Sequence, residues 1–74
     1  MKIEVRLFAT FRKGRWKNKS IDFETKTTIK NVIELLEIKE DEVSIALING
    51  KHSDIDEELH DGDVLSLFPP VGGG

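Results

Sequence analysis

The stretch TTIKNVIELLE, residues 27–37, has a hydrophobic period that differs from that of the flanking sequence. Its apolar residues recur at i, i+3, i+4 and i+7, the spacing of one helical face: Ile29, Val32, Ile33 and Leu36. Thr28 is a suitable N-cap, because its hydroxyl can bond an otherwise free backbone N–H of the first turn. We therefore predict one helix of about three turns. The polar cluster at residues 39–42 is expected to end it.

On both sides of this helix, apolar and polar residues alternate with the period of two that is typical of half-buried strands. The apolar positions of the four segments are Ile3, Val5 and Leu7; Ile21 and Phe23; Val43, Ile45 and Leu47; Leu65 and Leu67. The first two segments form a predicted hairpin with a long basic loop around Gly14. Asn49-Gly50 predicts a tight type I′ hairpin, because both residues tolerate positive φ angles. Pro69-Pro70 ends the last strand, because proline cannot donate to a ladder.

The predicted order is strand, strand, helix, strand, short strand and final strand. A single helix laid across one face of a mixed sheet buries all these apolar stripes. The sequence therefore predicts an α+β protein with the β-grasp, or ubiquitin-like, fold. At 74 residues the chain forms one domain. We expect residues 1–68 to be the β-grasp domain and residues 69–74 a flexible C-terminal tail.

Composition narrows the possible classes of function. The chain has no cysteine, which excludes disulfides and thiolate chemistry. No apolar run approaches the roughly 20 residues of a membrane helix, and the amino-terminal residues do not resemble a signal peptide. The net charge of −3 argues against nucleic acid as a partner. We expect a cytoplasmic protein that binds neither membranes nor nucleic acid.

Charge is distributed unevenly along the chain. Basic residues gather at positions 12–19 and acidic residues at positions 54–63. Such runs usually form solvated loops. The alternative is electrostatic steering toward a protein partner.

The alternation also predicts which residues leave the core. If Leu7 and Leu67 point toward the helix, Phe8 and Phe68 point to the opposite face of the sheet. In β-grasp proteins the first and last strands are neighbours, which brings the two rings together. Two aromatic rings on a solvent-facing sheet indicate a protein-binding surface. The alternative is that a bulge turns one of the rings into an edge of the core.

The last six residues carry the strongest functional signal: Pro69, Pro70, Val71, Gly72, Gly73 and Gly74. Prolines hold a chain extended, and glycines have no Cβ, so the tail is thin. Such a tail suits a narrow channel in another protein, where its terminal carboxylate meets chemistry. A carboxylate is a poor electrophile and needs activation, most simply to an acyl-adenylate made from ATP. Hydrosulfide equivalents then give a thiocarboxylate, and a lysine amine gives an amide.

Other catalytic or metal chemistry has little support in this sequence. His52 and His60 are the only histidines, no cysteine accompanies them, and no further ligands stand at suitable spacing. No serine or threonine has a His–Asp constellation to activate it. We predict no metal site and no enzymatic activity of the chain itself.

Three segments of the chain resemble the MoaD/ThiS family of sulfur carriers, and more closely its molybdopterin synthase small-subunit branch. The segments are Leu7-Phe8-Ala9-Thr10-Phe11-Arg12, Leu59-His60-Asp61-Gly62-Asp63 and the ending Phe68-Pro69-Pro70-Val71-Gly72-Gly73-Gly74. The resemblance implies a carrier that binds no cofactor and is a monomer when free. An E1-like enzyme would use ATP to adenylate Gly74, which becomes a thiocarboxylate.

The same resemblance implies a second partner, a larger catalytic subunit of the molybdopterin synthase type. Gly73 and Gly74 would insert into it and donate sulfur to a pterin precursor. The partner-binding residues would be Phe8, Arg12, His52 and Phe68. His52 departs from the usually apolar residue of this patch, and the segment between the helix and Val43 is short, as in thiamine-pathway carriers.

Three alternatives to a molybdopterin carrier therefore stay open. The chain could be a thiamine-pathway sulfur carrier, or a ubiquitin-like modifier joined to lysines through Gly74. It could also be a non-covalent interaction domain whose glycines are incidental.

Overall fold

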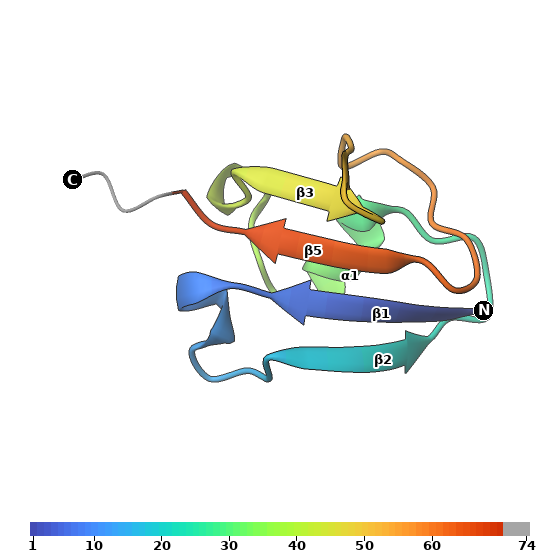
Figure 1. Ribbon diagram of the computed structural model, residues 1–74, viewed down its shortest axis with the longest axis horizontal. Helices are drawn as coiled ribbons and strands as arrows, with labels where there is room; N and C mark the ends of the chain where they lie inside the picture. The colour runs from blue at the N-terminus through green and yellow to red at the C-terminus, as the bar shows by residue number, and fades with distance from the viewer. Residues whose placement is uncertain (71–74) are drawn as a thin grey trace.

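A computed structural model describes residues 1–70 of the chain. It contains one five-stranded mixed sheet in the order β2-β1-β5-β3-β4, with the helix α1 across one face (Figure 1). This is the predicted β-grasp fold of the α+β class. The elements, in chain order, are β1 (Lys2–Leu7), the 3-10 turn η1 (Ala9–Arg12), β2 (Asn18–Asp22), α1 (Ile29–Leu35), the 3-10 turn η2 (Glu40–Glu42), β3 (Ile45–Ile48), β4 (Lys51–His52) and β5 (Val64–Phe68).

The last strand, β5, lies in the middle of the sheet. It pairs in parallel with β1, so that Leu67 is the partner of Leu7, and antiparallel with β3. β2 and β4 pair antiparallel with β1 and β3 and form the two edges. The amino terminus and the end of β5 therefore lie at opposite ends of the sheet (Figure 1).

The hydrophobic core lies between α1 and the inner face of the sheet. Its strand residues are Ile3, Val5, Leu7, Leu65 and Leu67, and its helix residues are Ile29, Val32 and Ile33, all fully buried. Full burial of such a side chain contributes about 1.5–3 kcal/mol to folding. Phe11, Ile38, Ala46 and Leu59 close the margins of this core. The inward positions predicted for the first and last strands are confirmed.

The helix begins as predicted and ends earlier than predicted. Thr28 is the N-cap, and its side chain and that of Asn31 form a reciprocal capping box. The helix has seven residues, about two turns, because Glu37 adopts a left-handed φ of 59°. The bonds Ile38 N–H to Ile33 O (2.8 Å) and Glu37 N–H to Glu34 O (3.0 Å) then form a Schellman motif.

The polar cluster at residues 39–42 lies beyond this helix end, so the prediction that it terminates the helix is wrong. Its residues Glu40–Glu42 form the separate turn η2. The helix ends at the left-handed Glu37, where the chain changes direction, and the next residue, Ile38, is buried in the core.

The predicted face of β3 is also wrong. The strand begins at Ile45, and the residue that it buries is Ala46, which is 6% exposed. The register explains this, because Ala46 is the partner of the inward-facing Leu67 and Ile45 is the partner of Phe68. Ile45, 36% exposed, therefore lies on the outer face.

The turn predicted at Asn49-Gly50 is confirmed, and the Asn49 side chain ties it to the start of β5. Asn49 and Gly50 have φ angles of 51° and 81°, as a type I′ turn requires. The Asn49 Nδ2 group donates to Asp63 Oδ1 (2.9 Å), and its Oδ1 accepts from Val64 N–H (2.9 Å). The second carboxylate oxygen of Asp63 accepts from His60 N–H at 2.8 Å.

Candidate functional site

The outer face of the sheet presents a stacked aromatic pair at the end of β5. The rings of Phe8 and Phe68 have centroids 4.2 Å apart and planes inclined by 10°. Phe8 N–H donates to Leu67 O (3.2 Å), which continues the β1–β5 pairing beyond the end of β1. Both rings are partly exposed, outside the core. The prediction that both leave the core and meet is confirmed, and the alternative of a buried ring is wrong.

Ile45 extends this aromatic pair across the sheet. It stands directly opposite Phe68 in the β3–β5 ladder, and opposite residues on one face of a sheet lie in contact range. Leu47, two residues along β3, is on the same face and is paired with His52 of β4. Sequence reasoning missed Ile45, because it counted Ile45 with the apolar positions of an alternating strand, although the run Ile45–Ile48 is apolar at every position.

Arg12 lies beside the aromatic pair, and His52 lies apart from it. Arg12 Nε donates to Leu7 O at 2.7 Å, and its guanidinium carbon is 5.3 Å from the centroid of the Phe8 ring. His52 is exposed at the end of β4, with β3 between it and Phe68. The structure thus brings together three of the four predicted partner-binding residues.

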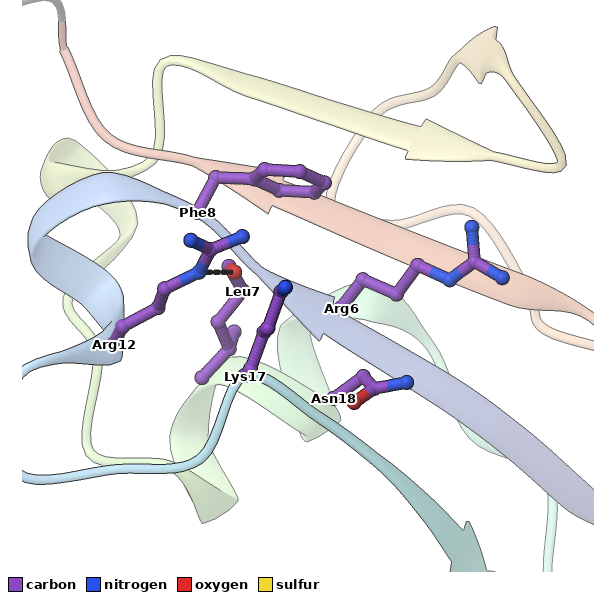
Figure 2. A pocket seen from close by; sticks show the side chains of 6 residues that line it. All are labelled: Arg6, Leu7, Phe8, Arg12, Lys17 and Asn18. Carbon is purple, nitrogen blue, oxygen red and sulfur yellow. Dashed lines mark hydrogen bonds between the residues drawn. The ribbon is translucent and has the colours of Figure 1, made fainter.

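A pocket of about 330 Å³ opens next to Phe8, between β1 and the start of β2. The lining residues, drawn in Figure 2, are Arg6, Leu7, Phe8, Arg12, Lys17 and Asn18. Three of them carry a positive charge. Figure 2 shows the guanidinium of Arg12 and the ammonium of Lys17 on the same side of the Phe8 ring, with Arg6 pointing away from them. Arg6 pairs instead with Glu4 through Nε and Oε2, at 2.5 Å.

The predicted tail begins at the end of this surface. Pro69 is partly buried and Pro70 is exposed, directly after Phe68. The predictions for Val71, Gly72, Gly73 and Gly74 concern positions outside the described residues and stay predictions.

The arrangement can bind a protein surface. Stacked rings with a neighbouring guanidinium are groups that anchor protein interfaces. Within residues 1–70 no group of three or more His, Asp or Glu side chains could hold a metal ion. In the same part of the chain no helix is long and apolar enough to cross a membrane.

Comparisons with solved structures agree with this fold. A putative molybdopterin converting factor subunit 1 from Pyrococcus furiosus is 30% identical, with a TM-score of 0.76 over 96% of this chain and 99% of that one. Subunit 1 in a complex of subunits 1 and 2 of molybdopterin-converting factor from Helicobacter pylori is 32% identical, with a TM-score of 0.67 over the whole of both chains. Small archaeal modifier protein 1 from Haloferax volcanii, 24% identical, shares the fold, with a TM-score of 0.74 over 95% of this chain and 98% of that one.

A comparison with curated protein sequences gave no significant match. A model of the ThiS family matches residues 5–74, which include the aromatic pair, the glycine-rich ending and all of the core except Ile3. This match covers nearly the whole chain. The chain therefore belongs to the ThiS family, a group of small β-grasp carrier proteins.

Proposed function

We propose that the chain is a sulfur carrier for molybdopterin synthesis and that its working group is the carboxylate of Gly74. One observation carries the proposal. Phe68 belongs both to the exposed aromatic pair and to the ending Phe-Pro-Pro-Val-Gly-Gly-Gly, so the docking surface leads directly into the tail. A partner that binds Phe8 and Phe68 therefore contacts the residue directly before the tail.

The chemistry that we propose has two activation steps, both performed by an E1-like partner. The carboxylate of Gly74 attacks the α-phosphate of ATP, which gives an acyl-adenylate and releases pyrophosphate. A hydrosulfide equivalent then attacks the acyl carbon, AMP leaves, and the product is a thiocarboxylate. The chain supplies the acyl group and the docking surface, and ATP is a substrate of the partner.

We propose a second partner, a larger catalytic subunit that takes the sulfur for a pterin precursor and returns the carboxylate. The Helicobacter pylori structure, in which subunit 1 of molybdopterin-converting factor is bound to subunit 2, supports such a pairing. The carrier is proposed to act in the cytoplasm and to be a monomer when free.

Mass spectrometry of the protein isolated from its own cell tests this proposal. A thiocarboxylate at Gly74 adds about 16 Da, because one oxygen is replaced by sulfur. The expected result is this increment on the C-terminal peptide, lost when the activating enzyme is deleted. A chain that continues beyond Gly74 without processing, or a carboxylate unchanged by the activating enzyme and ATP, would contradict the proposal.

A second candidate is a ubiquitin-like modifier that uses the same carboxylate to form amides with lysines. The observation that favours it is the likeness in fold to small archaeal modifier protein 1. Branched Gly-Gly remnants on lysines of other proteins, recovered after proteolysis, would identify this modifier. Their absence, together with a thiocarboxylate at Gly74, would identify the carrier.

A further inference from the structure

We propose that the pocket beside Phe8 is a receptor for a carboxylate side chain of the protein partner, held between Arg12 and Lys17. The partner would present an aspartate or glutamate next to apolar residues that cover Phe8, Phe68 and Ile45. The proposal rests on the proposed function only for the identity of that partner, the activating enzyme or the larger subunit.

Arg12 is oriented before any partner arrives. Its Nε–H is bonded to Leu7 O, and its guanidinium carbon lies 5.3 Å from the Phe8 ring centroid. These two contacts hold the guanidinium beside the Phe8 ring, where Arg12 lines the pocket (Figure 2). A guanidinium held in this way matches a carboxylate with two parallel hydrogen bonds.

Lys17, the residue before β2, supplies the second charge. Its backbone carbonyl accepts from Leu7 N–H at 2.9 Å, so the same residue of β1 anchors both Arg12 and Lys17. Within residues 1–70 no acidic side chain lies within 4.0 Å of either cationic group, whereas Arg6 is paired with Glu4. Two uncompensated cations therefore face one small space in a protein whose net charge is −3.

The surroundings favour a protein carboxylate over a nucleic-acid phosphate. On one side the pocket continues into the apolar surface formed by Phe8, Phe68 and Ile45, which suits a protein interface. The acidic residues at positions 54–63 and the negative net charge repel an extended phosphate backbone. A second copy of this chain could also supply a carboxylate. The experiment below distinguishes such self-association from binding to a different protein.

The first arm of the test uses short peptides, so that it does not depend on the proposed function. Nuclear magnetic resonance of the labelled protein is followed during titration with acetyl-Leu-Glu-Leu amide, with its Gln counterpart, and with inorganic phosphate. We expect the Glu peptide to shift the Arg12 Nε–H and Lys17 resonances and the Gln peptide to leave them in place. Raising NaCl from about 0.05 M to about 0.5 M should weaken the binding severalfold, because salt screens exposed charges.

Matched variants locate the binding. Lys17→Gln should weaken binding of the Glu peptide up to about fivefold, and Arg12→Gln about tenfold. Lys19→Gln is the control, because it removes the same charge from a position paired with Val5, on the other face of the sheet. Arg12→Gln loses the side-chain bond to Leu7 O and could therefore impair folding. Lys17→Gln then still tests the proposal, because Lys17 bonds Leu7 through its backbone carbonyl, which the substitution leaves in place.

The second arm measures the affinity of the full chain for the activating enzyme and for the larger subunit, with the same variants. Losses for Lys17→Gln and Arg12→Gln, with none for Lys19→Gln, would support a carboxylate of that partner. If neither protein binds the wild-type chain, the proposed function fails, and the peptide titration still decides the pocket.

Four results would overturn the assignment. The first two are equal resonance shifts from the Glu and Gln peptides, and equal losses of affinity for Lys17→Gln and Lys19→Gln. The other two are tighter binding of inorganic phosphate than of the Glu peptide, and self-association of the chain that Lys17→Gln abolishes. The last would make a second copy of the chain the occupant.

Discussion

Leu67 and Phe68 are consecutive residues of β5, and their side chains lie on opposite faces of the sheet. Leu67 is fully buried against α1, whereas the ring of Phe68 stacks on Phe8 at the outer surface. Removing each side chain should therefore have a different effect. Loss of the first leaves a cavity in the core, and loss of the second removes a contact surface.

Phe68→Ala should weaken partner binding with only a small loss of stability. We expect the free energy of unfolding to fall by about 1–2 kcal/mol, from the lost ring stacking and partial burial. The matched variant Leu67→Ala should cost about 2–5 kcal/mol. Urea denaturation and affinity for the larger subunit are the measurements. A loss for Phe68→Ala as large as that for Leu67→Ala would show that the ring belongs to the core.

The bond between Asn49 and Asp63 can be tested by exchanging the two residues. Asn49→Asp places two carboxylates in contact where a donor met an acceptor, and should cost about 1–3 kcal/mol. In the double variant Asn49→Asp/Asp63→Asn the amide and the carboxylate change places. The bonds to Val64 N–H and His60 N–H both retain an acceptor oxygen.

We expect the double variant to recover more than half of the loss at neutral pH, as judged by a double-mutant cycle from urea denaturation. Additive losses would mean that the side chains contribute independently of one another.

For single residues, the sequence predicts correctly which face of the sheet a side chain occupies where one face of the strand is purely apolar. The alternation in β1 and β5 predicted the outward positions of Phe8 and Phe68. The run Ile45–Ile48 is apolar on both faces, and only its pairing with β5 identifies Ala46 as inward. The bond from Arg12 to Leu7 O depends on the path of a loop, for which no periodicity exists.

Among the elements, α1 has a start that the sequence predicts and an end that it does not. Its start has a sequence signal, Thr28, and that prediction is confirmed. Its end is a Schellman motif whose left-handed position is usually glycine, and here it is Glu37. Because no glycine marks this position, the helical spacing that includes Leu36 predicts a helix about one turn longer than α1.

Glu37→Gly should stabilise the protein. A residue with a Cβ costs about 1–2 kcal/mol in the left-handed region, and glycine removes that strain at the expense of greater freedom in the unfolded chain. The expected net gain is about 0.5–1 kcal/mol in the free energy of unfolding. Glu37→Ala keeps the Cβ and is the control, with no comparable gain. Thermal and urea unfolding measure both, and an equal gain for alanine would contradict this explanation.

Considered as a whole molecule, the protein separates its stability from its proposed chemistry. The described core lies between Ile3 and Leu67, whereas the proposed acyl group is at Gly74. The family match and the β-grasp order could both be predicted from sequence, because they depend on periodicity and on a terminal motif. The convergence of Arg12 and Lys17 could not, because it requires the three-dimensional path of residues 8–17.

Deletion of Gly74, or addition of one alanine after it, should abolish thiocarboxylate formation and leave folding unaltered. The physical reason is that the reactive carboxylate moves by one residue, about 3.5 Å along an extended chain, whereas no core side chain changes. Mass spectrometry after incubation with the activating enzyme, ATP and a sulfur donor measures activation, and thermal unfolding measures the fold. Thiocarboxylate on either variant would contradict the proposed mechanism.

The parallel pairing of β1 with β5 has a mechanical consequence. Force applied to the carboxyl end of β5 while the amino terminus is held loads all the β1–β5 hydrogen bonds together in shear, because the two strands run side by side in one direction. Bonds loaded together resist far more tension than bonds that peel open one after another. Tension on the carboxyl end of β5 is therefore borne by the whole β1–β5 ladder.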